Sequence, residues 1–230
     1  MTPLLVLLFG FHPITAVGTD LLYASATKSV GTVVHGAGRT VDWRIVRRLS
    51  LGSIPAAVAT LLFLSYAGQR FAGTQHVISV LLGVTLILTA FATVSRRLIL
   101  ARFARVMARV SPDRIGRATI VLGGVLGILV TLSSIGAGAI GMTVLIGLYP
   151  ASPVNRLVGT DIAHAVPLTL IAGLGHLVMG SVDLSVLASL LAGSVPGVVL
   201  GSLLSGRVSE AALRPVLAGV LFIVGGRLLF

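Results

Sequence analysis

Several long apolar stretches constrain what this chain can fold into more than any other feature of its sequence. Each runs for about 18 residues or more, the length that a helix rising ~1.5 Å per residue needs to cross ~30 Å of hydrocarbon. Only 10% of the residues are charged and the mean hydropathy is +1.07, so lipid is the expected solvent. The expected spans are residues 14–37, 45–66, 77–95, 118–133, 156–178, 185–204 and 213–229, with shorter apolar pieces at 1–11 and 142–150. The sequence therefore predicts an all-α, polytopic integral membrane bundle of about 7–8 spans.

The net charge of +11 comes mainly from arginines that lie between the apolar segments. Seven arginines fall within 96–117 and four within 39–48. If 118–150 crosses the membrane once, as a helix broken at its glycines, these two basic loops share one face. The opposite loops then carry four arginines: Arg70, Arg156, Arg207 and Arg214. The positive-inside rule places the basic loops in the cytoplasm, and this pattern argues against a nucleic-acid partner.

Several classes of chemistry are excluded by what the sequence lacks. There is no cysteine, which excludes a disulfide scaffold, thiol catalysis and Cys-ligated zinc. The first apolar run has neither a basic n-region nor a small-residue cleavage site before it, so no removable signal peptide is expected. No ATPase motif and no converging set of metal ligands is evident. We therefore expect no cofactor, no metal and no soluble enzymatic activity.

An internal repeat with an offset of 141 residues is the most informative feature of the sequence. Val-Gly-Thr-Asp recurs at 17–20 and 158–161, and Gly-Ser-x-Pro at 52–55 and 193–196. Rare polar residues also align: His35 with His176, and Asp42 with Asp183. Composition alone would align leucines and valines but not these residues. We therefore predict two homologous repeats, in parallel orientation because an even number of spans separates matching helices.

The first copy is expected to be N-terminally short. The second copy follows the glycine-rich segment 133–141, and the counterpart of this segment would lie upstream of Met1. A misassigned start codon and a genuinely reduced protein are the two explanations. The predicted organisation is a first transmembrane repeat at 1–95, a basic cytoplasmic connector at 96–117 and a second transmembrane repeat at 118–230.

Four short motifs, most of them repeated in the second copy, support a family assignment. They are Pro13-x3-Val17-Gly18-Thr19-Asp20, Lys28 followed by Gly31-Thr32-x2-His35, the loop Val41-Asp42-Trp43, and Gly52-Ser53-Ile54-Pro55. Over almost the whole chain the combined pattern resembles the sulfite exporter TauE/SafE family of bacterial membrane transporters. The resemblance implies two copies of a four-span unit in the cytoplasmic (inner) membrane and a small sulfur-containing anion as cargo. The departure from the family is the missing glycine-rich segment before the first repeat.

The glycine-rich segment itself has two structural interpretations. Residues 136–141 match the pattern GxGxxG, but apolar runs of membrane length on both sides exclude a Rossmann unit. The segment then serves either close helix packing or a helix break that turns backbone N–H groups toward a cavity. A cluster of Ser133, Ser134, Gly136 and Gly138 favours the break, and a half-helix N-terminus suits an anionic substrate.

Lys28 is the only lysine in the chain and lies about halfway along the span 14–37. An unpaired charge there would cost several kcal/mol. One interpretation is structural: Lys28 reaches an interface or pairs with Asp20, two turns away on the same helix. The other is that Lys28 binds a transported anion.

Asp20 and Asp161 occupy matching positions just inside helix starts. Capping and the helix dipole would explain both, and proton coupling is the alternative. His35 and His176 lie at matching helix ends, while His164 lies one turn after Asp161. These histidines are candidates for a proton relay, against the alternative of interfacial hydrogen bonding.

Two prolines and two further aspartates lie at helix starts in both copies. Asp42 and Asp183 are expected to cap helices, and Pro55 and Pro196 are candidate hinges, with packing as the alternative. Between the copies, the segment Arg96 to Arg117 places arginines at helical spacing. It predicts an interfacial amphipathic helix that contacts anionic lipid headgroups and ends at Pro112.

These features together predict a secondary transporter with its substrate site between the repeats near the midplane. By resemblance it exports small anions of the sulfite and sulfonate class, coupled to protons. The alternatives are an anion channel or passive facilitator, a non-transporting assembly partner, and an intramembrane enzyme using Ser133 or Ser134 with His164 or His176. Association of the chain with further copies of itself into a homo-oligomer is a further alternative.

Overall fold

The computed structural model describes residues 1–37, 41–70, 80, 84, 112–134 and 137–205. The helical elements are α1 (Thr2–Phe9), α2 (Pro13–Ala37), α3 (Trp43–Arg70), α6 (Pro112–Ser133), the π-helical turn η1 (Ala137–Gly141), α7 (Met142–Leu148), α8 (Val154–Val178) and α9 (Leu184–Ser205). No strand occurs in these ranges, so the predicted all-α membrane bundle is confirmed. The predicted spans 77–95 and 213–229, and most of the predicted connector, lie outside the described residues.

Among the described residues, three helices are long and apolar enough to cross a membrane by themselves: Trp43–Tyr66, Arg114–Ser133 and Val154–Val178. Their outer faces carry large apolar side chains, among them Leu62 and Phe63 on α3 and Val121 on α6, which are more than half exposed. An apolar surface of this kind is favourable against lipid and unfavourable against water, because water gains nothing from contact with apolar side chains.

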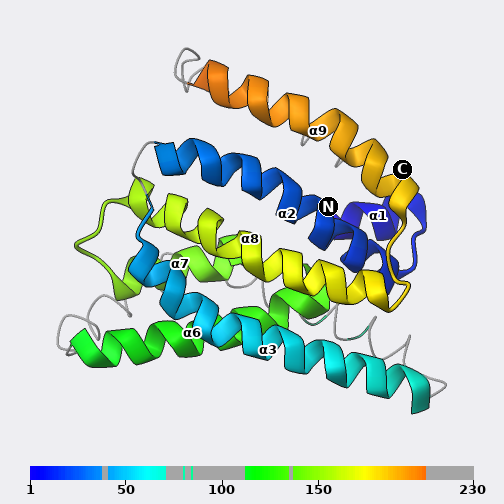
Figure 1. The fold of residues 1–230 in the computed structure, drawn as a ribbon, viewed down its shortest axis with the longest axis horizontal. Helices are drawn as coiled ribbons and strands as arrows, with labels where there is room; N and C mark the ends of the chain where they lie inside the picture. Colours follow the sequence, from blue (N-terminus) through cyan, green and yellow to red (C-terminus); the bar gives the residue numbers. More distant parts are fainter. Residues whose placement is uncertain (38–40, 71–79, 81–83, 85–111, 135–136, 206–230) are drawn as a thin grey trace.

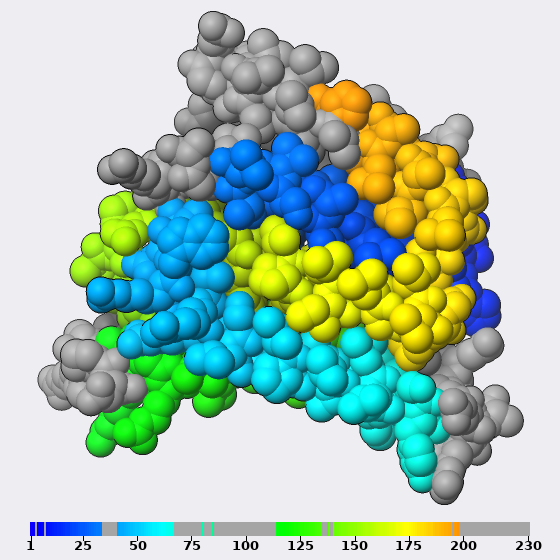
Figure 2. Space-filling model, in the orientation of Figure 1, coloured from blue at the N-terminus to red at the C-terminus, as the bar shows by residue number. Residues whose placement is uncertain are grey.

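The helices pack in a sequence that alternates between the two predicted repeats. Helix α8 lies between α2 and α3, α9 packs on the other side of α2, and α6 packs against α3 (Figure 1). Figure 2 shows α9, α2, α8 and α3 side by side on one face of the molecule. Neither repeat therefore forms a separate bundle, and each inner helix is covered by helices of the other copy.

The two inner helices, α2 and α8, run in opposite directions. Near the start of α2, a Cβ on Gly18 would overlap the carbonyl oxygen of Ser181, which follows the end of α8. Near the end of α2, a Cβ on Gly31 would lie 3.5 Å from Ile162 in the first half of α8. The predicted parallel orientation of the repeats is thus wrong for these helices. Residues that match across the 141-residue offset lie on two helices that run in opposite directions.

The reason for this inversion is a helical hairpin made by α6, η1 and α7. Helix α6 ends at Ser133, and Ser134 takes a left-handed φ of 58° that turns the chain. The hydroxyls of Thr119, near the start of α6, and Tyr149, just after α7, are 2.8 Å apart. The chain is therefore broken at its glycine-rich segment, as predicted, but it returns toward its starting side. The expectation that 118–150 crosses once is wrong, and the directions of the described helices α8 and α9 change with it.

The hairpin also moves Arg156 to the basic end of the bundle. Its guanidinium forms an ion pair of 3.1 Å with Asp42, at the start of α3, where the sequence had suggested the opposite loops. Arg48 lies at the same end, since a Cβ on Gly116 would be 3.2 Å from its guanidinium carbon. Pro112 begins α6, so Arg114 and Arg117 lie in that helix.

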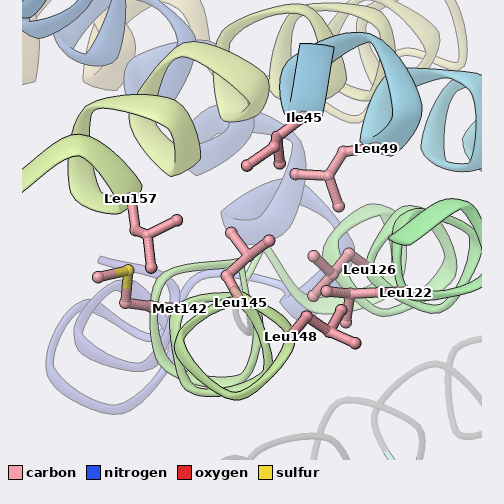
Figure 3. Packing of buried hydrophobic residues seen from close by; sticks show 8 residues of the cluster. All are labelled: Ile45, Leu49, Leu122, Leu126, Met142, Leu145, Leu148 and Leu157. Atoms are coloured by element: carbon pink, nitrogen blue, oxygen red, sulfur yellow. The ribbon is translucent and has the colours of Figure 1, made fainter. Parts of the chain in front are cut away.

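Close packing of α3 against α6 depends on glycine. A Cβ on Gly52 would overlap the carbonyl oxygen of Ile120, and a Cβ on Gly123 that of Leu49. We call these two glycines, together with Gly127, the glycine seam. Without side chains at these positions the two backbones approach closely, as small residues allow in membrane bundles. Beside the seam lies an apolar core shared by α3, α6, α7 and α8 (Figure 3), made of Ile45, Leu49, Leu122, Leu126, Met142, Leu145, Leu148 and Leu157.

Two hydrogen bonds related by the 141-residue offset join the copies. The backbone N–H of Asp42 donates to the hydroxyl of Thr160 at 2.8 Å, and the N–H of Asp183 donates to that of Thr19 at 3.0 Å. Each bond ties the turn before an outer helix of one copy to the inner helix of the other. The same contact is thus made twice, once at each end of the bundle.

Candidate functional site

The side chain of Lys28 projects from the middle of α2 into the interface with α8. It is partly buried there, and its charge interacts with that of Asp161 and, more weakly, with that of Asp20. Among the described residues no carboxylate oxygen lies within 4.0 Å of the ammonium group. The ion pair with Asp20, one of the structural alternatives for Lys28, is therefore not formed, and Lys28 faces two acids without contacting either.

Asp161 lies on α8, opposite Lys28, and is 7% exposed. Its Oδ1 atom is buried and has no hydrogen-bond partner among the described residues. A Cβ on Gly141, at the junction of η1 and α7, would lie 3.2 Å from this oxygen. The absence of a side chain at Gly141 thus lets the carboxylate pack directly against the returning arm of the hairpin. A buried carboxylate oxygen without a donor is costly, so its position calls for a functional explanation.

Asp20, the residue that matches Asp161 across the offset, has a different set of partners. Its Oδ2 accepts hydrogen bonds from the backbone N–H and the hydroxyl of Thr2, at 2.8 and 2.7 Å, and lies 3.2 Å from the amine of Met1. Asp20 sits about two turns inside α2 and caps α1, whereas capping of its own helix had been the expectation. These contacts give Asp20 a structural role, which is to hold the start of α1 against α2.

His164 lies one turn after Asp161 on α8 and is fully buried. Its Nε2 atom is 2.9 Å from the hydroxyl of Ser53 on α3, and its Nδ1 atom has no partner among the described residues. Like Asp161, His164 interacts electrostatically with Lys28. We call Lys28, Asp161, His164 and Ser53 the polar cluster.

Sequence reasoning did not select Ser53, although Gly-Ser-x-Pro is one of the repeated motifs. A hydroxyl within an apolar membrane helix was the available signal. Its partner on α8 could not be identified before the helices were packed.

The other predicted histidines lie away from the polar cluster. His176 is on α8 twelve residues after His164, about 18 Å further along the helix axis. Its Nε2–H donates to the carbonyl oxygen of Thr131 at 3.0 Å, which satisfies one of the last carbonyl groups of α6. His35 lies in the last turn of α2, and its side chain is outside the described part of the structure.

The serines and glycines of the predicted helix break surround the turn of the hairpin. Ser133 donates to the carbonyl oxygen of Leu129 at 2.7 Å, while the buried hydroxyl of Ser134 has no partner among the described residues. Gly138 is exposed, and Gly136 lies outside the described residues. These residues lie toward the end of α6 near His176, so the structure does not bring them to Lys28.

Both predicted hinge prolines, Pro55 in α3 and Pro196 in α9, are exposed. Neither ring points into the polar cluster. Asp42 and Asp183 cap their helices as predicted: Asp42 Oδ1 accepts from the N–H of Arg44 at 3.1 Å. Hydrogen bonds from the hydroxyl of Ser185, and then from backbone N–H groups, lower the pKa of Asp183.

Two surface grooves do not coincide with the polar cluster. A groove of about 380 Å³ lies between α3 and α6, and one of about 360 Å³ lies between α3 and α8. Their walls are almost entirely apolar and face outward, so they suit lipid acyl chains better than an anion. Within the described ranges, no group of three His, Cys, Asp or Glu residues is placed to hold a metal ion.

Comparison with known proteins adds two findings. The protein-family model "Sulfite exporter TauE/SafE" matches residues 1–228. A Bacillus subtilis (strain 168) protein described as "Probable membrane transporter protein YjnA" is 36% identical over 190 residues, which cover 82% of this chain and 74% of that protein. No solved structure matches the chain.

Proposed function

The chain belongs to the sulfite exporter TauE/SafE family of membrane transporters, and from this premise we propose that it exports small sulfur-containing anions, coupled to protons. As a member of that family it is a multi-pass membrane transporter and not an enzyme. The proposed cargo is an anion of the sulfite and sulfonate class. The cytoplasmic side is proposed to be the end that carries Arg48, Arg114 and Arg156.

The observation that carries the proposal is the environment of Lys28. A lone ammonium group in the middle of the inner helix α2, without an ion-pair partner in the described part of the chain, is a strong candidate for an anion ligand. Its interface with α8 joins matching helices of the two predicted repeats. Secondary transporters built from inverted repeats commonly bind substrate at such an interface.

Proton coupling is assigned to Asp161 and His164, because both interact with Lys28 and both have a buried atom without a partner in the described structure. Asp20 is the less suitable candidate, since Thr2 already donates to it twice. His176 lies too far along α8 to exchange a proton with the polar cluster directly. Pro55, Pro196 and the glycine-rich turn are proposed to serve movement of the helices around the site.

The proposal is tested by uptake of radiolabelled sulfite, thiosulfate and ethanesulfonate into inverted membrane vesicles. Saturable uptake above that of vesicles without the protein is expected for at least one of these anions. The Lys28→Ala variant should lose this uptake by tenfold or more, because an anion bound without its counter-charge in low dielectric loses several kcal/mol.

Arg44→Ala is the matched control, since it removes one positive charge from an exposed position at the basic end. It should keep uptake within about twofold, as expected for a solvent-screened charge. Uptake that never saturates would support the channel alternative. Absence of uptake for all three anions, with folded protein in the vesicles, would contradict the proposed cargo and favour the non-transporting assembly partner.

A further inference from the structure

The polar cluster holds one positive charge that two different anions can neutralise in turn. Asp161 is the carboxylate that interacts most strongly with Lys28, and it lies close without contacting the ammonium group. A transported anion bound at Lys28 would therefore bring a second negative charge beside Asp161. Two like charges at short range in a buried site disfavour each other, and protonation of the carboxylate removes the conflict.

We propose that Asp161 takes up a proton when the anion binds to Lys28, so that proton and anion cross the membrane in the same direction. This inference rests on the proposed function. In the empty carrier the Lys28 ammonium is balanced by the Asp161 carboxylate. In the loaded carrier the same ammonium is balanced by the anion, and Asp161 is a neutral carboxylic acid. One proton moves with each anion, and the charge of the site is unchanged when the anion is monovalent.

This scheme also explains why the site would not leak protons or uncompensated anions. A carrier with a protonated Asp161 and no anion would hold an unpaired ammonium group, and one with the anion and an ionised Asp161 would hold an excess negative charge. Both are costly in a buried site, so the two balanced states are the ones that move.

The groups around Asp161 are compatible with this assignment. Helix α2 contributes Lys28 and, more weakly through it, Asp20, whose Oδ2 atom is held by Thr2. Helix α8 contributes His164, whose Nε2 atom is engaged with Ser53 of α3. Among the described residues, Lys28 is the charged group that acts on Asp161, and the described parts of α3, α6, η1 and α7 add none. Asp161 is therefore the acid in the cluster with a free buried oxygen to receive the proton.

If the proton and the anion move in the same direction, acid pH must strengthen binding of the anion. If the anion is exchanged for a proton, acid pH need not strengthen anion binding. By reciprocity, the factor by which the anion favours protonation is the factor by which protonation favours the anion. The dissociation constant of the anion should fall at least about fivefold from about pH 8 to about pH 5. Because the proton and the anion move together, an inward proton gradient opposes export, and the proposed export requires an outward anion gradient that exceeds it.

The experiment uses the full chain reconstituted in liposomes that contain a pH-sensitive dye, with the membrane potential clamped. Ethanesulfonate is the first probe, because it stays anionic across the pH range and its free acid does not carry protons through lipid. An inward ethanesulfonate gradient should acidify the lumen in proportion to anion entry. Thiosulfate and sulfite serve as second and third probes.

Two matched variants locate the proton. Asp161→Asn mimics the protonated acid permanently, so it should still exchange internal for external anion but should lose net uptake and lumenal acidification. Asp20→Asn, at the repeat-equivalent position, should retain both.

Anion entry with lumenal alkalinisation would overturn the inference and leave the proposed function standing. Anion entry with no pH change would overturn both the inference and the proposed proton coupling, and would leave only the proposed cargo. Proton movement that persists in Asp161→Asn, or that disappears in Asp20→Asn alone, would overturn the assignment to Asp161. A wild-type protein that takes up none of the three anions would instead overturn the proposed function, and with it the inference.

Discussion

The α3–α6 and α2–α8 interfaces both join distant parts of the chain, but they use opposite kinds of contact. Across the glycine seam, α3 and α6 meet backbone to backbone, with no space for even a methyl group. Between α2 and α8 lie a lysine, a carboxylate with an unpartnered oxygen, and a buried histidine. A glycine contact has one geometry, whereas a charged contact changes its energy with each proton or anion bound. One interface thus fixes the bundle, and the other is suited to respond to ligands.

The largest effect is expected from adding one methyl group to the glycine seam. Gly123→Ala would drive a Cβ into the carbonyl oxygen of Leu49, while Gly124→Ala would meet nothing closer than 3.9 Å. We expect Gly123→Ala to lower the free energy of unfolding by about 1–3 kcal/mol, as overpacking does in tight cores. Reversible unfolding in mixed detergent micelles, followed by circular dichroism, measures it.

The neighbouring variant is the control for this prediction. Gly124→Ala should leave stability unchanged or raise it slightly, since alanine is the better helix former by up to about 1 kcal/mol. Equal behaviour of the two variants would mean that the seam is not tightly packed, and the contrast between the interfaces would fail.

A smaller effect is expected from removing the hydroxyl that joins the polar cluster to α3. Ser53→Ala leaves His164 Nε2 buried without its partner, which should cost about 1–2 kcal/mol. Thr60→Val on the same helix is the control, because the Thr60 hydroxyl bonds only to the carbonyl oxygen of Ala56. The same unfolding assay applies, and a Ser53→Ala loss no greater than that of Thr60→Val would show that the contact does not stabilise the interface.

The offset-related bonds from Thr19 and Thr160 should contribute less. Thr19→Val and Thr160→Val should each lower the free energy of unfolding by about 0.6 kcal/mol, the average for hydrogen bonds between membrane helices. Thr27→Val, which removes a bond within α2, is the control. Clearly unequal losses would show that the two ends of the bundle are held differently despite the matching geometry.

The smallest effect concerns Asp183 at the start of α9. The pKa of Asp183 is lower in the folded chain than in the unfolded chain. The stabilisation that its carboxylate gives the folded chain is therefore complete above the unfolded pKa of about 3.9 and is lost as the pH falls toward the folded pKa. The difference in the free energy of unfolding between the wild type and Asp183→Asn should therefore become smaller below about pH 4. Thermal melting between neutral and acid pH measures this difference, and a gap that widens in acid would contradict the capping role.

Sequence alone predicted the helices well because hydropathy and length define them. The expected spans 14–37, 156–178 and 185–204 lie within two residues of α2, α8 and α9. The prediction failed where the chain turns. An apolar segment interrupted by glycines has the same sequence pattern whether it continues across the membrane or returns. Ser134, at the start of the turn, has a left-handed φ of 58°, and nothing in the residue pattern specifies it.

The site was predicted in part for a similar reason. Lys28 stood out as a charge in an apolar span, and Asp161 and His164 stood out by their spacing of one turn. That these three meet depends on the antiparallel packing of α2 and α8, which follows from the hairpin. Ser53 and the different partners of Asp20 and Asp161 are likewise products of packing, which a single sequence does not encode locally.

The alternating order of the helices has a consequence for how the protein is made. Lys28 is synthesised 133 residues before Asp161, so at about 5–20 residues per second roughly 7–27 seconds separate them on the ribosome. During that interval α2 enters the bilayer without α8 or α9 beside it, and Asp20 on the same helix is the nearest carboxylate that its lysine has. Lys28 therefore enters the bilayer before Asp161 can act on it, and the cost of its charge at that stage is not offset by α8.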